Sequence, residues 1–191
     1  MLLGFRAVRS ATLASCVIDA LPPGQVLDYE RFWHFSVSVG MIAELLGRAE
    51  RIHQDEAFTA GVLHNVGRLA LDQRLPQGLQ LAVRLAERDG ILLRDAEHRV
   101  LGFTDAELGG ALAQHWNFPT PLAESVARHE LNVDQLPDPR SLAAFVVRAR
   151  LYCRAHGLSD GADPARRNEP PAEWMRPPLS QALRRAGGME A

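Results

Sequence analysis

One segment combines residue types that could bind a metal. His64 stands directly before Asn65 within the mostly apolar run from Phe58 to Leu71. An imidazole beside a carboxylate can hold divalent metals, which lower the pKa of a bound water. Asn65 offers only a neutral carbonyl in the place of that carboxylate. The segment therefore holds one metal-ligand candidate beside a residue that weakens the pair.

Four further motifs surround this segment in a recognisable order. They are Arg31–Ser36 (RFWHFS), Leu101–Gly109 (LGFTDAELG), His115–Pro119 (HWNFP) and Ala127–Glu130 (ARHE). Together with the His64 segment, they resemble the pattern of the HDOD family, the HD-related output domains of bacteria. The resemblance covers about residues 1–158 and is strongest from Trp33 to His129.

The resemblance implies a metal pocket with altered ligands. Where the family carries a histidine before a serine, this chain has Phe35, and His34 lies one residue earlier. One residue is a rotation of about 100° on a helix, so His34 cannot simply take over the role. Asp105 and Glu130 replace two further histidines of the pattern, although both could ligate a metal. The implied vestigial pocket comprises His34, His64, Asn65, Asp105, His129 and Glu130, and we predict no catalytic residue, bound metal or cofactor there.

These residues also have local structural interpretations, which we favour. His64 lies on an apolar helix and is expected to be a buried, hydrogen-bonded imidazole, whereas His34 is expected at a helix surface. Thr104–Glu107 matches a capping box, which accounts for Asp105 in a first helical turn. Glu130 is expected at a solvated helix terminus.

The last predicted helix lacks an acid that the resemblance would supply. HD-type proteins commonly carry a late metal-binding aspartate there, but this chain reads Val147–Leu151 (VRARL). Arg148 and Arg150 would add positive charge if they faced the pocket. We favour an outward, solvated orientation for both.

Composition is typical of a single globular domain. The chain has 191 residues, 47% of them hydrophobic, which is enough to bury a substantial core. Its net charge of −2 gives no electrostatic footprint for nucleic-acid binding. No apolar run approaches the ~20 residues of a membrane span. Cys16 and Cys153 stand far apart and are expected to be reduced thiols of a cytoplasmic protein.

Helix punctuation predicts an all-α, HD-like bundle of about seven to eight helices over residues 1–158, followed by a Pro/Gly-rich, flexible tail at 159–191. One continuous helix, capped by Asp55, is predicted to carry His64 to about residue 73. Gly61 and Gly67 lower its helix propensity, which indicates close helix packing. Thr120 is predicted to cap a later helix. The remaining helices are expected at about 2–21, 28–46, 77–89, 94–101, 104–117 and 139–156.

The beginning of the chain predicts an interaction surface. The segment from Leu3 to Arg9 resembles one in the middle of the family's domain, so the chain resembles only the HD-like C-terminal portion. The side chains of Leu2, Leu3, Phe5 and Val8 then need an apolar partner. We expect a protein partner or self-association through this helix, with no nucleic-acid or membrane partner.

Two functions remain open. The altered ligands favour a non-catalytic signalling or regulatory module that binds other proteins. The alternative is a divergent metal-dependent phosphohydrolase acting on a nucleotide or cyclic dinucleotide.

Overall fold

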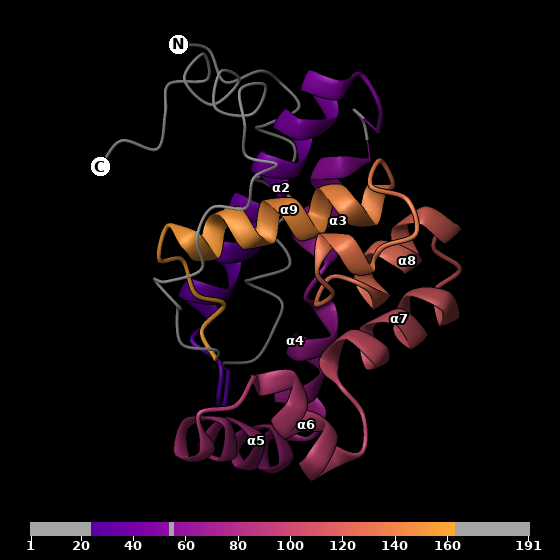
Figure 1. Cartoon of the computed structure of the whole chain (residues 1–191). Helices are drawn as coiled ribbons and strands as arrows, with labels where there is room; N and C mark the ends of the chain where they lie inside the picture. The colour runs from indigo at the N-terminus through magenta and orange to yellow at the C-terminus, as the bar shows by residue number, and fades with distance from the viewer. Residues whose placement is uncertain (1–23, 54–55, 163–191) are drawn as a thin grey trace.

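The computed structural model describes residues 24–53 and 56–162, and these residues form helices and connecting turns (Figure 1). The all-α prediction is confirmed. The helices are α2 (Tyr29–Glu50), α3 (Ala57–Leu63), α4 (Val66–Arg74), α5 (Pro76–Asp89), α6 (Leu93–Leu101), α7 (Asp105–His115), α8 (Thr120–Ala127) and α9 (Leu142–Ala155), with a 3₁₀ turn, η1 (Val133–Gln135). The predicted helix at 2–21, the Asp55 cap and residues 163–191 lie outside the described part.

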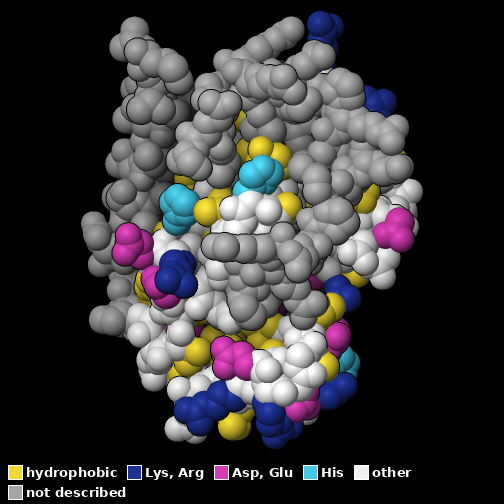
Figure 2. Space-filling view, turned by 60° about the vertical axis from the view of Figure 1, so that its left-hand side comes forward, with side chains coloured by type: hydrophobic (Ala, Val, Ile, Leu, Met, Phe, Trp, Pro, Cys, Tyr) yellow, Lys and Arg dark blue, Asp and Glu magenta, His cyan; other side chains and the backbone are white. Residues whose placement is uncertain are grey.

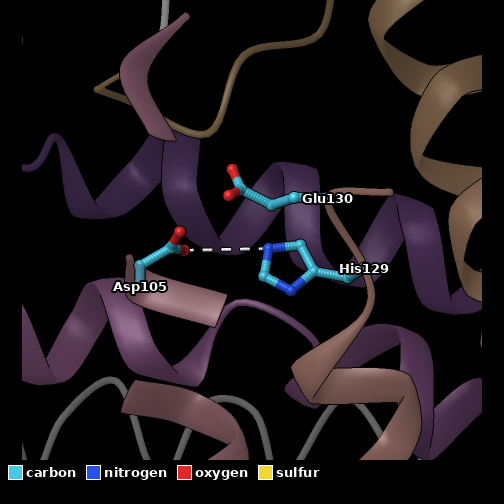
Figure 3. A group of neighbouring side chains, drawn as sticks. All are labelled: Asp105, His129 and Glu130. Atoms are coloured by element: carbon cyan, nitrogen blue, oxygen red, sulfur yellow. Dashed lines mark ion pairs between the residues drawn. The ribbon is translucent and has the colours of Figure 1, made fainter. Parts of the chain in front are cut away.

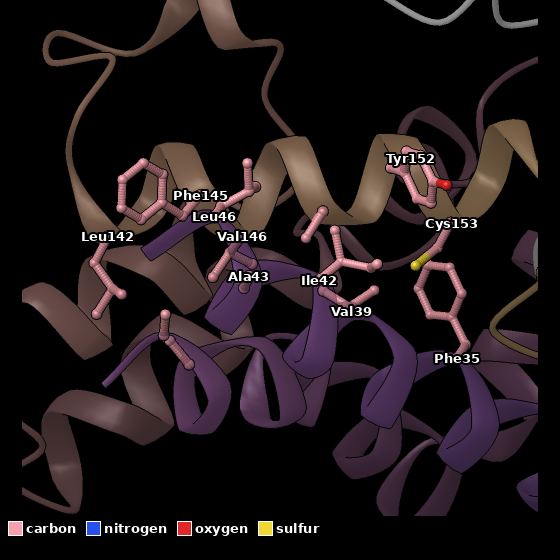
Figure 4. Close-up of a cluster of buried hydrophobic side chains, with 13 residues drawn as sticks. Phe35, Val39, Ile42, Ala43, Leu46, Leu142, Phe145, Val146, Tyr152 and Cys153 are labelled. Carbon is pink, nitrogen blue, oxygen red and sulfur yellow. The ribbon is translucent and has the colours of Figure 1, made fainter. Parts of the chain in front are cut away.

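The main apolar core lies between α2 and α9, which cross one another (Figure 1). In Figure 4, Phe35 of α2 lies beside Tyr152 and Cys153 of α9, and Val39 and Ile42 belong to the same buried cluster as Val146. Burial of such side chains contributes roughly 1.5–3 kcal/mol each relative to exposure. Apolar contacts therefore hold α2 and α9 together.

Side-chain caps fix the N-terminal ends of α2 and α9. Asp28 accepts a hydrogen bond from the backbone N–H of Arg31 at 3.1 Å, as predicted. The helix continues past the predicted end at Leu46 to Glu50 and closes with Arg51 in the left-handed region, φ 59°. The last helix begins three residues later than predicted, because Ser141 accepts from the N–H of Ala144 at 3.2 Å and so defines its start.

The predicted single helix carrying His64 is interrupted. His64 and Asn65 form a turn between α3 and α4, so that prediction was wrong at its centre. The close packing predicted from the two glycines is confirmed. A Cβ at Gly61 would lie 2.5 Å from the Cα of Gly40, and one at Gly67 would lie 1.9 Å from the carbonyl oxygen of Asp105. Backbone meets backbone at both places, on α2 and on α7.

Helices α7 and α8 follow, and their starts differ in how they are capped. Thr104 and Glu107 form the predicted capping box at the start of α7. Thr120 does not cap α8 as predicted; it is the first helical residue, after Pro119. Trp116 lies against Phe118 with ring centroids 5.7 Å apart, whereas His115 is exposed.

Helix length and surface charge characterise the described part of the molecule further. No helix in the described ranges has the length and apolar character needed to cross a membrane. Acidic and basic side chains are interspersed over the lower end of the molecule in Figure 2, where α5 and α6 lie in Figure 1. That surface presents no uniform basic face in this view.

Candidate functional site

Side chains from four helices and three connecting segments converge on one buried ionic cluster. We use "Arg68 cluster" for Arg68 on α4, Glu97 on α6, Asp105 on α7, His129 and Glu130 after α8, Arg150 on α9 and Asp160 after α9, with His64 at the α3–α4 turn beside them. Close approach of α4 to α7 at Gly67 brings Arg68 and Asp105 together. The packing of the backbone therefore builds the site.

The two histidines lie side by side in the interior. The ring centroids of His64 and His129 are 5.1 Å apart. Each ring places Nδ1 against a carbonyl oxygen of its own segment, at 2.6 Å to Gly61 and 2.7 Å to Val126. A carbonyl only accepts, so Nδ1 carries the hydrogen in both neutral rings and Nε2 is left without one.

Burial keeps both imidazoles neutral. It lowers the pKa of His64 well below its usual value, and the neighbouring His129 lowers it further. Burial also lowers the pKa of His129 to about 4, although the charge of Asp105 opposes this. Both rings are thus unprotonated near neutral pH, and Nε2 of His64 has no hydrogen-bond partner among the described residues.

Asp105 lies between a permanent cation and an imidazole. Its Oδ1 is 3.1 Å from Nη2 of Arg68, and its Oδ2 is 3.7 Å from Nε2 of His129. Figure 3 shows the carboxylate directed at the His129 ring, with Glu130 alongside. Burial acts to raise the pKa of Asp105, but Arg68, His129 and the hydrogen bond with Glu97 together hold this pKa below its usual value.

Arg68 is the centre of the cluster, with its side chain only 2% exposed. Nη1 donates to Oδ2 of Asp160 at 2.6 Å. Nη2 lies 3.5 Å from Oε1 of Glu97 and 3.5 Å from Oε1 of Glu130, in addition to its contact with Asp105. Burial opposes the charge, yet these carboxyl groups hold the pKa of Arg68 well above its usual range.

Glu97 and Glu130 share the guanidinium of Arg68 with the aspartates, and both have a raised pKa. Burial and the Asp105 charge raise the pKa of Glu97 to about 9 and that of Glu130 to about 7. Oε2 of Glu97 accepts the backbone N–H of Asp105 at 2.9 Å, which ties α6 to the start of α7. Glu97 is therefore protonated at neutral pH and acts as a structural tie.

The structure brings together most of the predicted pocket and excludes one residue. His64, Asn65, Asp105, His129 and Glu130 are in or beside the Arg68 cluster, whereas His34 is exposed on α2. Phe35 points inward instead, with its ring centroid 5.7 Å from that of His64. The position where the family pattern has a histidine thus reaches the site, but with a side chain that cannot ligate. Neither amide atom of the buried Asn65 has a hydrogen-bond partner among described residues.

Three local interpretations from the sequence were wrong. Glu130 is not solvated, because its side chain is only 9% exposed and contacts Arg68. Arg150 does not point outward; it is buried, with Nη2 3.9 Å from Oε1 of Glu130. Arg148 is also largely buried and donates to Glu50 at 2.8 Å.

Sequence reasoning also missed three charged residues of the cluster. Arg68 interrupts an apolar helix between Gly67 and Leu69, which is a signal for a buried charge with partners. Asp160 was placed in the tail, but residues 159–162 belong to the described part and Asp160 is buried. No local pattern distinguishes Glu97 from a solvated helix residue.

The HD-type resemblance implies that a metal ion would bind among these residues. Ligand atoms of Asp105, His129 and Glu130 lie within 4.8 Å of one another. An ion bound by these oxygens would sit about 2.0–2.6 Å from them. The guanidinium nitrogen Nη2 already lies 3.1 and 3.5 Å from the same two carboxylates. The residues as arranged therefore do not fit a metal ion.

A model of the HDOD domain family matches residues 1–131, which is more than half of the chain. The chain therefore belongs to the HDOD family, as its motifs predicted. An uncharacterized protein of Treponema pallidum is 29% identical over 152 residues, which cover 73% of this chain and 28% of that protein.

Two solved structures share the fold. An HDOD domain protein of unknown function from Geobacter sulfurreducens matches with a TM-score of 0.75 and 25% identity, over 98% of this chain and 64% of that chain. A protein of Shewanella amazonensis, provisionally described as a phosphohydrolase, matches with a TM-score of 0.69 and 26% identity, over 97% of this chain and 64% of that chain. This chain thus spans less than two thirds of each relative.

Proposed function

We propose that this chain is a non-catalytic signalling or regulatory module of the HDOD family that acts in the cytoplasm through contacts with other proteins. One observation carries the proposal: the guanidinium of Arg68 contacts both carboxylates, of Asp105 and Glu130, that could ligate a metal. A hydrolase of this type needs a metal-bound water as its nucleophile. A cation fixed among the ligands leaves no room for that chemistry.

Two substitutions in the pocket support the same conclusion. Phe35 places an apolar ring 5.7 Å from His64, and Asn65 supplies a neutral amide beside it. His64 and His129 are 1% and 2% exposed. A substrate phosphate would have to displace packed side chains to reach them.

A module without chemistry must act through its surface. Met41 on α2 and Leu81 on α5 are 55% and 56% exposed, and Trp116 is 49% exposed. Leu2, Leu3, Phe5 and Val8 add the apolar segment expected to bind a partner or a second copy of the chain. The interspersed charges of Figure 2 support a protein partner over a nucleic acid.

A second candidate is a divergent metal-dependent phosphohydrolase that acts on a nucleotide or cyclic dinucleotide. The proximity of Asp105, His129 and Glu130 favours it, as does the free Nε2 of His64. The description of the Shewanella relative points to the same chemistry. This candidate requires Arg68 to leave its four carboxyl contacts.

Metal content and turnover decide between the two. Protein purified without chelator should carry no stoichiometric transition metal by elemental analysis. Hydrolysis of a phosphomonoester, a nucleotide and a cyclic dinucleotide should stay at background with added manganese, iron or magnesium. Close to two metals per chain, or turnover that disappears in both His64→Ala and His129→Ala, would establish the hydrolase instead.

Light scattering tests the proposed apolar surface. The wild type should self-associate, and a Phe5→Glu, Val8→Glu variant should be monomeric, because charges cannot be buried without partners. A Phe5→Leu, Val8→Ile variant is the matched control and should associate like the wild type. A monomeric wild type at high concentration, equal to a folded Glu variant, would refute self-association through this segment.

A further inference from the structure

A single nitrogen of Arg68 lies where the acidic ligands of the pocket meet. Nη2 is 3.1 Å from Oδ1 of Asp105 and 3.5 Å from Oε1 of both Glu130 and Glu97. Asp105 and Glu130, with His129, are also the residues whose ligand atoms lie within 4.8 Å of one another. The guanidinium thus contacts two of the three residues that would bind an ion.

A second imidazole lies beside these residues with one nitrogen unpartnered. Nδ1 of His64 is used by the carbonyl of Gly61, and the ring centroid of His129 is 5.1 Å from that of His64. Nε2 of His64 is buried and makes no hydrogen bond among the described residues. Burial also keeps the ring neutral, as metal ligation requires. Buried acceptors in proteins normally have a partner, and a metal ion is a partner that imidazole commonly binds.

We propose that Arg68 is an internal cation that takes the place of a divalent metal, and that removing its charge opens a metal site made by Asp105, His129 and Glu130. The inference rests on the proposed non-catalytic function and identifies the residue that enforces it. Two carboxylates and an imidazole form a donor set suited to zinc or another late transition metal, with a fourth position left for water.

Charge and distance make a metal ion and the Arg68 guanidinium mutually exclusive in this site. Bonds from a metal ion to the oxygens of Asp105 and Glu130 are about 2.0–2.2 Å long, so the ion would lie close to Nη2 of Arg68. Two positive charges at that separation repel strongly in a buried site. Arg68 cannot relieve this by losing its proton, because guanidinium stays charged in proteins.

Zinc binding to four proteins tests the inference. Wild type and Arg68→Lys retain a cation and should bind no zinc at the site. Arg68→Met should bind one zinc ion per chain by isothermal titration, at least about a hundredfold more tightly than wild type. Adding His129→Ala to Arg68→Met should remove that binding, which separates the site from exposed histidines such as His34.

Loss of Arg68 leaves buried carboxyl groups unpaired and can prevent folding. The Arg68→Gln, Asp160→Asn variant therefore removes one carboxylate together with the cation and keeps the proposed ligands. Both variants are also refolded with and without zinc chloride, because an ion that binds only the folded state must stabilise it. Recovery of the fold by zinc supports the site.

Two results would overturn the inference. Folded Arg68 variants that bind zinc no better than wild type would show that Arg68 is not what excludes the metal. Failure of zinc to rescue variants that do not fold would show the same. In either case an inert, metal-free wild type would leave the proposed function standing, whereas a metal-loaded, active wild type would overturn both.

Discussion

Gly67→Ala should destabilise this protein although it adds a better helix former. Gly67 lies in the first turn of α4, where its backbone touches the start of α7. A Cβ there would lie 1.9 Å from the carbonyl oxygen of Asp105 and 2.7 Å from the backbone nitrogen of Gly109. Both neighbours are backbone atoms of one helix, so neither can rotate away as a side chain would.

The magnitude follows from two opposing terms. Alanine gains about 1 kcal/mol of helix propensity over glycine. Overpacking a rigid contact costs about 1–3 kcal/mol and occasionally more. Here α4 and α7 would have to separate by more than 1 Å to reach an ordinary contact of about 3.4 Å. The shift would also lengthen the 3.1 Å contact between Arg68 and Asp105, whose loss costs a further few kcal/mol in a buried pair. We expect a net loss of about 2–4 kcal/mol.

Urea unfolding followed by circular dichroism measures this difference. Gly78→Ala is the matched control, because Gly78 also lies within a helix but its added Cβ would meet only Cδ2 of Leu101, at 2.5 Å. The Leu101 side chain can adopt another rotamer, so Gly78→Ala should leave the free energy of unfolding unchanged or raise it slightly. Equal stability of Gly67→Ala and Gly78→Ala would refute the reasoning that backbone contact at Gly67 sets the geometry of the site.

Three further outcomes can be measured. The folded protein holds the proton of Glu97 up to about pH 9, far above the ordinary value of 4.5, so its stability contribution is full below pH 4.5 and is lost as the pH rises through 9. The free energy of unfolding should fall by on the order of 2 kcal/mol from pH 7 to 9, where the two buried histidines no longer titrate. Glu130, with a pKa of about 7, contributes a smaller part, so Glu97→Gln should remove most of this slope. Asp72→Ala should destabilise by several kcal/mol in thermal melts, because the carboxylate accepts the backbone N–H groups of Gln25, Val26 and Leu27 at 3.2, 2.7 and 3.1 Å, and an Asp72→Asn control should lose less. Asn65→Asp alone should create no hydrolysis in the assays above, since Arg68 still occupies the pocket; turnover by this variant would contradict that expectation.

Local signals in the sequence predicted most of the helices but not how they join. Capping by Asp28 and the Thr104–Glu107 box depend on neighbouring residues, so their outcome was predictable. The break at His64 and Asn65 has no such signal, because it arises where α3 packs on α2 and α4 packs on α7. Tertiary contact decided the course of the chain there.

The same distinction applies to the site. A resemblance in motif order identified His64, Asp105 and His129, and the structure brings these together. Glu130 and Arg150 were assigned to solvent because single helices carry charged residues mainly on exposed faces. Their burial depends on Arg68 and on Asp160, 92 residues further along the chain. Arg68 leaves a local signal because it interrupts an apolar helix, but the sequence around Glu130, Arg150 and Asp160 does not identify them as its partners.

Gly67 and Arg68 are neighbours in the chain, and their effects depend on each other. Gly67 lets the start of α7 approach α4, which buries Asp105, and Arg68 supplies the charge that a buried carboxylate requires. A metal ion could also neutralise the acids, but it would be exchangeable and sensitive to chelators. A guanidinium is attached to the chain and keeps its charge. Because the cation is built in, chelators should leave the thermal unfolding of the wild type unchanged, while they should reverse any stabilisation that zinc gives to Arg68→Met. The identity of residue 68 would then decide whether this fold depends on its own side chain or on a metal.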